Sequence, residues 1–267
     1  SSSSSNSWKG YGEGTISVLS VAPRIVSVTS DKKSITPGEW VTVTVKATND
    51  GPDTAPLQTL HIGLPFDPPS ADIEIVFTDL SGGAQIYYKG DTIWVNGEPK
   101  PARYPIIEGW QEDWPPGTVR TLQIKVRFPD TDTVTFDVKT VACDENWNVI
   151  ARDPSSGMID QQGEYVRPYL ILRKFSVAIA PSGTREVDVV ITNHDRQPYI
   201  GTQPSMSVDD FTVTDYGGMD RTRVSITATN LGLVIPPGES GVLKIEITTS
   251  GHPTGTYTIQ YTVSGSP

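Results

Sequence analysis

The sequence contains one cysteine in 267 residues, Cys143, so no disulfide can form within the chain. It also has no run of 18 apolar residues, the least expected of a helix that spans a membrane. Acidic residues outnumber basic ones by 31 to 21, which argues against a nucleic-acid partner, because such partners bind a basic face. The chain is long enough to bury a core without disulfides, in one domain or two.

Signatures of catalysis are missing as well. His61, His194 and His252 lie in different segments, without the spacing of a metal site. There is no Gly-x-Ser-x-Gly nucleophile elbow and no glycine-rich phosphate loop. We therefore predict a protein that is not an enzyme and that needs no zinc, haem or nucleotide.

What the sequence does contain is a repeat. Residues 115–126, PPGTVRTLQIKV, resemble residues 236–247, PPGESGVLKIEI. Residues 37–49, PGEWVTVTVKATN, likewise resemble residues 181–193, PSGTREVDVVITN. All four segments alternate apolar and polar residues after a Pro/Gly turn, the pattern of a half-buried β-strand. The repeat predicts equivalent strands in two copies of one fold.

The predicted fold class is all-β, with two tandem immunoglobulin-like β-sandwiches, because short alternating segments separated by turn residues favour sandwiches over helical folds. We place the first sandwich at residues 21–154 and the second at residues 168–267. Residues 155–167 are rich in Gly, Ser and Gln and are interpreted as a linker. The Ser-rich residues 1–20 are interpreted as a flexible tether and lead-in.

Two long segments carry a family resemblance. SVTSDKKSITPGEWVTVTVKATNDGP, with the later WPPGTVRTLQIKVRF, resembles the CARDB class of immunoglobulin-like domains. IPPGESGVLKIEITTSGHPTGTYTIQYTVSG is similar to immunoglobulin-like modules of secreted glycosidases. The resemblance implies an extracellular or cell-surface setting, as in tandem modules of bacterial and archaeal proteins. It implies no catalytic residue.

Two acidic loops have the composition of calcium ligands. Asp130 and Asp132 lie in FPDTDTVTF, and Asp144 and Asn146 lie in ACDENWNVI. Calcium binds six to eight oxygen atoms, which closely spaced Asp and Asn side chains can supply. The alternative is that these are ordinary solvated turn residues, since neither loop matches the Asp-x-Asp-x-Asp-Gly pattern.

The two copies differ most in the length of chain that separates equivalent residues. Asn49 and Gly117 are 68 positions apart, whereas Asn193 and Gly238 are 45 apart. The surplus falls at about residues 81–114, which we call the aromatic insertion. Its large aromatic residues are Tyr87, Tyr88, Trp94, Tyr104, Trp110 and Trp114.

The aromatic insertion has two interpretations. It covers the edge of an open sandwich, or it presents exposed rings to a ligand. We expect a hairpin about Lys89-Gly90-Asp91 within it. Trp40 is a further candidate, because it falls on the Thr-rich face of its strand rather than on the apolar face.

The sequence as a whole favours a structural or adhesive role, as a spacer or docking unit of a surface assembly. The alternatives are a carbohydrate-binding module, and an accessory part of a secreted glycoside hydrolase or protease. The expected partner is accordingly a surface protein or a polysaccharide. No cofactor is expected, apart from calcium if the acidic loops bind it.

Overall fold

The computed structural model describes residues 7–95, 98–154, 158–159, 165–194 and 205–266. Its regular structure consists of β-strands and a single 3-10 turn, η1 (Ser70–Asp72). Within these residues there is no helix with the length and apolar character needed to cross a membrane. The prediction of an all-β fold is confirmed.

The strands β1 to β14, which we call the first half, form two main sheets and a small ribbon. One sheet has the order β1 (Pro23–Ser30), β3 (Trp40–Asn49), β10 (Arg120–Arg127), β5 (Ile73–Thr78). The larger sheet has the order β13 (Met158–Ile159), β14 (Tyr165–Arg173), β11 (Thr133–Cys143), β4 (Ala55–Gly63), β9 (Ile106–Trp114), β6 (Ala84–Tyr87). In it β12 (Val149–Asp153) also pairs with β11, and β2 (Ser34–Ile35) with β14. The ribbon pairs β7 (Thr92–Val95) with β8 (Glu98–Pro101).

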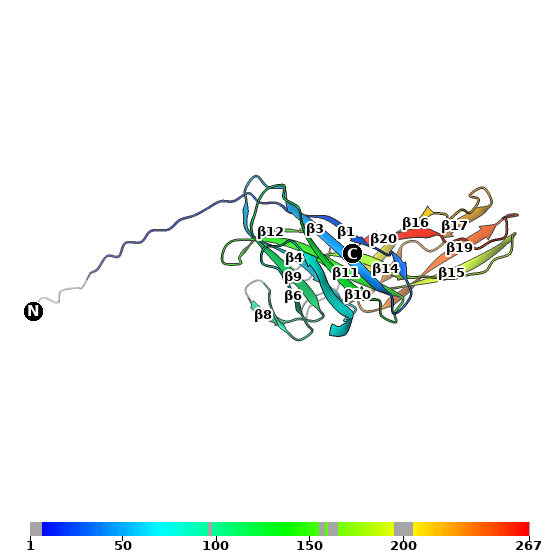
Figure 1. Ribbon diagram of the computed structural model, residues 1–267, viewed down its shortest axis with the longest axis horizontal. Helices are drawn as coiled ribbons and strands as arrows, with labels where there is room; N and C mark the ends of the chain where they lie inside the picture. Colours follow the sequence, from blue (N-terminus) through cyan, green and yellow to red (C-terminus); the bar gives the residue numbers. More distant parts are fainter. Residues whose placement is uncertain (1–6, 96–97, 155–157, 160–164, 195–204, 267) are drawn as a thin grey trace, which may run out of the picture.

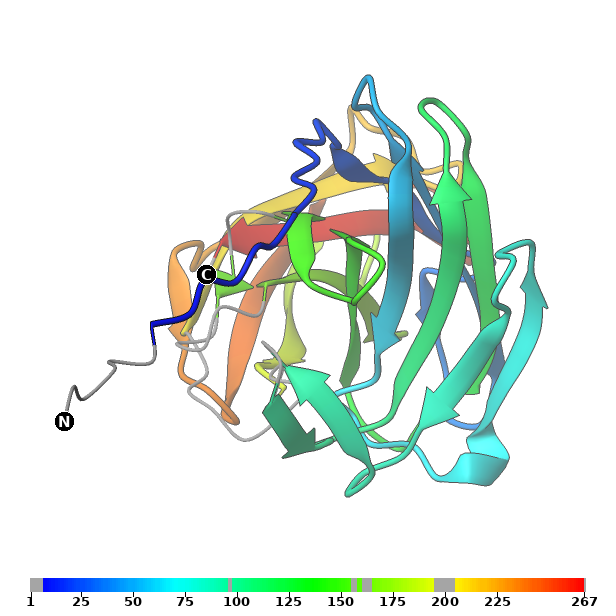
Figure 2. The same ribbon diagram turned by 90° about the vertical axis from the view of Figure 1, so that its left-hand side faces the viewer.

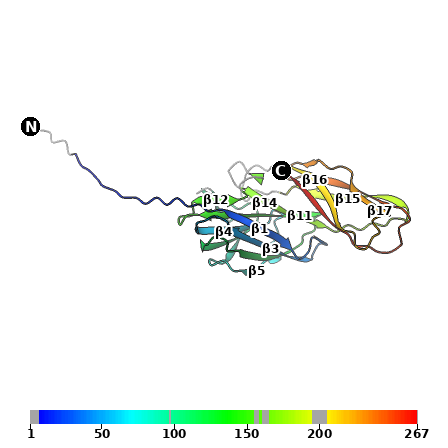
Figure 3. The ribbon, with the colours of Figure 1, turned by 90° about the horizontal axis from the view of Figure 1, so that it is seen from above.

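The strands β15 to β20, which we call the second half, form two three-stranded sheets. One has the order β15 (Gly183–Thr192), β19 (Ser240–Thr249), β17 (Val224–Ala228). The other has the order β18 (Leu233–Ile235), β16 (Met206–Asp215), β20 (Gln260–Ser266). Figures 1 and 3 show the two halves end to end, with residues 7–20 extending from the first half on the side away from the second.

The two halves repeat the same pairing. Val45 lies opposite Leu122 in the first half, as Val189 lies opposite Leu243 in the second. The strand order β3-β10-β5 recurs as β15-β19-β17, and the order β11-β4-β9 recurs as β20-β16-β18. The predicted equivalence of residues 41–49 with 185–193, and of 119–127 with 240–248, is confirmed.

Each half has a hydrophobic core to which both of its sheets contribute. In β3, Val41, Val43 and Val45 are buried while the Thr side chains between them are partly exposed. This alternation places one side of each strand against the other sheet, as a pleated strand requires. In the first half the opposing sheet supplies Leu60, Ile62 and other apolar residues to the same core.

A buried asparagine closes the first half at the end of β3. Asn49 Nδ2 donates hydrogen bonds to the backbone carbonyls of Asp53 at 2.8 Å and Trp114 at 3.1 Å. Its Oδ1 accepts the backbone N–H groups of Ala22 and Gly51, both at 3.0 Å. One side chain thereby satisfies four backbone groups from three segments of the chain.

The second half has the same contact at the equivalent position. Asn193 Nδ2 donates to the carbonyl of Ile235 at 3.0 Å. Trp114 and Ile235 both precede a Pro-Pro-Gly turn, and both are fully buried. In each half the glycine of that turn, at a φ near 75°, donates its N–H to the asparagine carbonyl at 2.8 Å. We call this arrangement the asparagine clasp.

The strand β14 crosses the predicted boundary at residue 168 and contributes to both halves. Its residues 167–172 pair with β11. Ile171 lies in the first core and Leu172, on the opposite face of the strand, in the second. Next to this strand, Thr133 Oγ1 accepts the N–H of Thr192, and its carbonyl accepts His194 Nε2 at 2.8 Å. Of the predicted linker, residues 155–157 and 160–164 lie outside the described residues.

Removing the clasp side chain should destabilise the protein. We expect Asn49→Ala to lower the free energy of unfolding by about 2–4 kcal/mol, because it leaves buried backbone groups without partners. Asn146→Ala is the matched control, since that side chain is exposed, and should change stability by about 0.5 kcal/mol or less. Denaturant unfolding measures both. Equal stabilities for the two variants would contradict the role of the clasp.

Candidate functional site

The aromatic insertion does not form the hairpin that its sequence suggests. β6 pairs with β9 and extends the large sheet, while β7 pairs with β8. The predicted pairing across Lys89-Gly90-Asp91 is therefore wrong, although a turn does occur there, with Asp91 N–H donating to the Tyr88 carbonyl. Figure 2 shows the β7–β8 ribbon standing apart from the main sheets.

Tyr104 holds this ribbon in place. Its ring is buried in a small cluster with Ala102 and Ile106, against which Ile93 of the ribbon packs. The Tyr104 hydroxyl donates to Asp137 Oδ2 at 3.2 Å. Its predicted part in a contact surface is therefore corrected. Because side chains alternate along a strand, anchoring Ile93 turns Trp94 toward solvent.

Trp114 also serves the interior. Its ring is fully buried in the first core, and its indole N–H donates to the carbonyl of Thr118 at 2.8 Å. Its predicted contact role is corrected in the same way. Trp110 is half-buried against Leu57, Val141 and Cys143, on the outer face of the large sheet.

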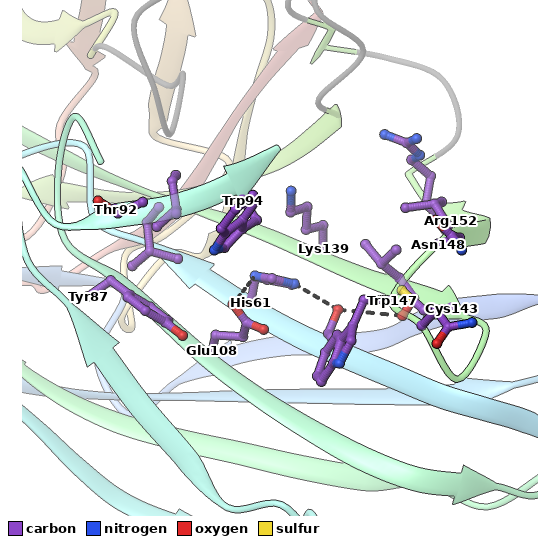
Figure 4. Close-up of a pocket in the computed structure, with 16 residues that line it drawn as sticks. His61, Tyr87, Thr92, Trp94, Glu108, Lys139, Cys143, Trp147, Asn148 and Arg152 are labelled. Carbon is purple, nitrogen blue, oxygen red and sulfur yellow. Dashed lines mark hydrogen bonds and ion pairs between the residues drawn. The ribbon is translucent and has the colours of Figure 1, made fainter. Parts of the chain in front are cut away.

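A pocket of about 690 Å³ lies on this outer face, between the sheet, the β7–β8 ribbon and the β11–β12 loop. We call it the outer-face pocket (Figure 4). Its described lining residues are Thr59, His61, Tyr87, Thr92, Ile93, Trp94, Ile106, Glu108, Lys139, Val141, Cys143, Asn146, Trp147, Asn148, Val149 and Arg152. Of the residues predicted from sequence, Tyr87, Trp94 and Asn146 meet here.

The sheet side of the pocket carries a row of polar residues from three neighbouring strands. Lys139 of β11 lies opposite His61 of β4, which lies opposite Glu108 of β9. His61 Nδ1 is 3.9 Å from Glu108 Oε2, and His61 Nε2 is hydrogen-bonded to Thr59 Oγ1 at 2.7 Å. The row faces outward because the alternate residues, such as Leu60 and Ile62, face the core.

Burial changes the protonation of this row. It lowers the pKa of His61 well below its usual range, and the nearby positive charge of Lys139 adds to the effect. It raises the pKa of Glu108, which the charge of Lys139 offsets in part. It also raises the pKa of Tyr87, and that of Cys143 to about 11. At neutral pH the imidazole and the thiol are therefore uncharged.

Two tryptophans flank this row. The side chain of Trp94 is 72% exposed and that of Trp147 is 50% exposed. Figure 4 shows them on either side of His61, with Lys139 beside Trp94. Trp147 packs edge-to-face on Trp110, with ring centroids 6.3 Å apart. Sequence analysis did not include Trp147, although a tryptophan inside an Asp/Asn-rich turn is a signal that could have revealed it.

The loop that carries Trp147 is ordered by Asp144. Asp144 Oδ1 accepts the backbone N–H groups of Asn146 at 2.8 Å and Asn148 at 2.9 Å. Its Oδ2 accepts Asn148 Nδ2 at 2.9 Å. These bonds hold the Asp144 pKa below its usual range and support Trp147 at a φ of 66°. This side chain, predicted as a calcium ligand, thus shapes the rim of the pocket.

The other predicted residues lie elsewhere. Trp40 is partly covered by Arg127 and Lys125 of the neighbouring strand, with the guanidinium carbon 4.8 Å from the ring centroid. Tyr88 is exposed at the turn after β6 and is absent from the described pocket lining. Neither Trp40 nor Tyr88 joins Trp94 and Trp147.

The DTDT loop forms ion pairs instead of an oxygen cluster. Arg173 lies 3.2 Å from Asp130 Oδ1 and 3.6 Å from Asp132 Oδ1. Across the described part of the chain, no group of three or more His, Cys, Asp or Glu side chains is placed to hold a metal ion. A calcium site at Asp130 and Asp132 would require Arg173 to move away.

Several solved structures are distantly similar to this chain. No protein-family model matches the chain, and no curated protein matches its sequence. An immunoglobulin-like protein from Nocardia farcinica is 14% identical, with a TM-score of 0.31, covering 55% of this chain and 98% of its own. AvmM, which catalyses macrocyclization in alchivemycin A biosynthesis, is 14% identical, with a TM-score of 0.29, covering 61% of this chain and 94% of its own. An N-terminal region of an enterococcal surface protein is 9% identical, with a TM-score of 0.28, covering 90% of this chain and 87% of its own.

Trp114 is buried and Trp94 is exposed, so truncating them should affect stability to very different extents. Trp114→Ala should lower the free energy of unfolding by about 3–5 kcal/mol, because it empties a core position. Trp94→Ala should change it by about 0.5 kcal/mol or less, because its ring is exposed. Thermal or denaturant unfolding of both variants provides the test. A large loss of stability in Trp94→Ala would show that its ring is packed.

The raised pKa of Glu108 predicts that removing its charge stabilises the folded protein at high pH but not at low pH. Folding favours the protonated carboxyl, because the pKa of Glu108 is higher in the folded state than in the unfolded state. Glu108 therefore destabilises the native state increasingly as the pH rises from about 4.3, the unfolded-state pKa, through the folded-state pKa. Glu108→Gln should therefore melt like the wild type at pH 4 and at a higher temperature at pH 8. A variant that melts lower than the wild type at pH 8 would refute this.

Proposed function

We propose that this chain is an adhesion module of a cell-surface or secreted protein, built from two tandem immunoglobulin-like β-sandwiches, and that the first sandwich binds carbohydrate in the outer-face pocket. The second sandwich then acts as a spacer or docking unit. This role also fits an accessory part of a secreted hydrolase, where a binding module would hold the substrate polymer.

The main support for this proposal is the placement of Trp94 and Trp147 on either side of the polar row that contains His61. A pyranose ring has a face of C–H groups, which packs on an aromatic ring, and hydroxyl groups at its edge, which need polar partners. Trp94 and Trp147 offer the aromatic surfaces, while Thr59, His61 and Glu108 offer hydrogen-bonding groups between them. Aromatic side chains beside a few convergent polar groups are typical of ligand pockets.

The lining favours binding over hydrolysis. Glycoside hydrolysis ordinarily uses a pair of carboxyl groups, one on each side of the bond that is cleaved. Among the described lining residues Glu108 is the one carboxylate. Cys143, the lining thiol, is buried and protonated at neutral pH, so it is a poor nucleophile.

The difference between the two halves supports the division of roles. Both contain the asparagine clasp and the same strand order, so these features belong to the scaffold. The β6 strand and the β7–β8 ribbon occur in the first half alone among the described elements. A shared scaffold with an unshared pocket supports a specific contact in the unshared part.

The proposal predicts loss of binding without loss of stability. Trp94→Ala and Trp147→Ala should each weaken binding to a glycan array by about tenfold or more, because exposed aromatic rings concentrate binding energy. Melting temperatures should stay within about 2 °C of the wild type, as for other surface changes.

Trp8→Ala is the matched control, because Trp8 is an exposed tryptophan that precedes the first strand and is absent from the described pocket lining. It should bind like the wild type. Wild-type protein that binds no member of a broad glycan array, or Trp94 and Trp147 variants that bind like the Trp8 variant, would reject the proposal.

A further inference from the structure

We propose that β20 pairs with a strand from a second copy of this chain, formed by residues 15–19 of that copy. This inference goes beyond the proposed carbohydrate binding and does not depend on it. It rests on a comparison of the two halves, because a strand closes the first half at a place where, among the described strands, none closes the second.

In the first half, β14 lies between β11 and β2. It pairs antiparallel with β11 over residues 167–172, and its last residues pair in parallel with Ser34 and Ile35 of β2. With β14 in this place, Ile35 is fully buried and β11 is buried along nearly its whole length. The strand β14 thus closes one side of the first core.

The second half contains the counterparts of both neighbours of β14. The strand order makes β20 the counterpart of β11, and among the described strands β20 pairs with β16 alone. Ile179 is the counterpart of Ile35, because each stands two residues before the proline that opens the matched segments 37–49 and 181–193. Ile179 lies outside the strands that the structure describes. We call the place between Ile179 and β20 the open slot.

Burial in the second half is incomplete beside the open slot. Ile179 is only partly buried, unlike Ile35. In β20, Tyr261 and Val263 pack against the second core but are only partly buried, and the other residues of the strand are exposed. An edge strand of this kind offers unpaired backbone groups to another strand. A strand in the open slot would pair with β20 and cover these apolar side chains.

Residues 15–19, TISVL, have the pattern of such a strand and lack a partner. Ile16 and Val18 alternate with polar residues and are 90% and 91% exposed. Within the described residues 7–19 the structure shows no strand and no hydrogen bond. Alternating β-branched residues favour strand pairing, and a strand needs a neighbour to satisfy its backbone.

The position of this segment in the chain matches that of β14. The strand β14 leads into the second half, as residues 15–19 lead into the first. A lead-in segment closes the first half by pairing antiparallel with β11. The same arrangement at the second half requires a lead-in segment antiparallel to β20, with Ile16 and Val18 turned toward the second core.

The lead-in segment that fills the open slot belongs to another copy. Ser20 N–H donates to Asp53 Oδ2 at 2.7 Å, and Asp53 N–H donates to the Ser20 carbonyl at 3.1 Å. These bonds fix the point where the segment leaves the first half, and Figures 1 and 3 show it leaving on the side away from the second half. The contact is therefore head-to-tail, and its repetition links copies into an open chain.

The first experiment measures self-association of the full chain by sedimentation velocity over a range of concentrations. We expect reversible association that Ile16→Asp or Val18→Asp weakens by about tenfold or more, because either change places a charge in an apolar slot. Ser17→Asp is the matched control, since Ser17 lies on the opposite face of the same segment and would point to solvent. It should associate like the wild type.

The second experiment locates the acceptor strand by cross-linking. Two proteins carrying Ser17→Cys and Thr262→Cys, each with Cys143→Ala, are mixed and treated with a short bismaleimide. Both positions are exposed, and the paired strands would place them on the same outer face. We expect a covalent dimer. Ser225→Cys on β17, exposed on the other sheet of the second half, is the matched control for Thr262→Cys and should give little dimer.

The outcomes decide the proposal. A chain that stays monomeric up to about 1 mM, or that associates equally well with Ile16→Asp and Val18→Asp, contradicts it. A cross-link that forms within one chain carrying both Ser17→Cys and Thr262→Cys at high dilution shows that the segment folds back, which also contradicts it. Glycan binding by Ile16→Asp should equal that of the wild type at each pocket, so failure of strand addition and failure of the carbohydrate proposal remain distinguishable.

Discussion

The asparagine clasp is the contact on which both halves of the structure depend. A strand that leaves a sheet exposes backbone groups, and in a buried corner these must find partners within the protein. Asn49 and Asn193 meet this requirement in the same way, by bonding the carbonyl that precedes a Pro-Pro-Gly turn. The glycine of that turn returns a hydrogen bond to the asparagine backbone. The clasp thus fixes β3 against β9 and β10, and β15 against β18 and β19.

With the scaffold fixed in this way, the first half can carry added elements without disturbing its core. The added strands β6, β7 and β8 precede β9 in the chain, and the clasp holds the last carbonyl of β9. Tyr104 packs the addition against the interior, and Trp94 remains at the surface. The outer-face pocket arises because the large sheet is covered on this side by the β7–β8 ribbon and the β11–β12 loop rather than by another sheet.

The two halves are joined by packing as well as by the chain. β14 pairs with β11 and presents Ile171 to one core and Leu172 to the other. Alternation along a strand makes this sharing possible, because neighbouring side chains point to opposite faces. A strand shared between two cores resists independent rotation of the halves more than a free linker would.

The sequence by itself determined the all-β class and the equivalence of strands between the two halves, because these follow from alternation and Pro-Gly turns, which are local in the chain. It also located the aromatic insertion and included Trp94 and Tyr87. It could not separate Trp114 from Trp94, since burial depends on which residues approach from elsewhere. The partners of β6, the membership of β14 and the meeting of Trp147 with His61, Glu108 and Lys139 were decided by tertiary structure alone. These depend on pairing between strands that are distant in sequence, and no local pattern encodes such pairing.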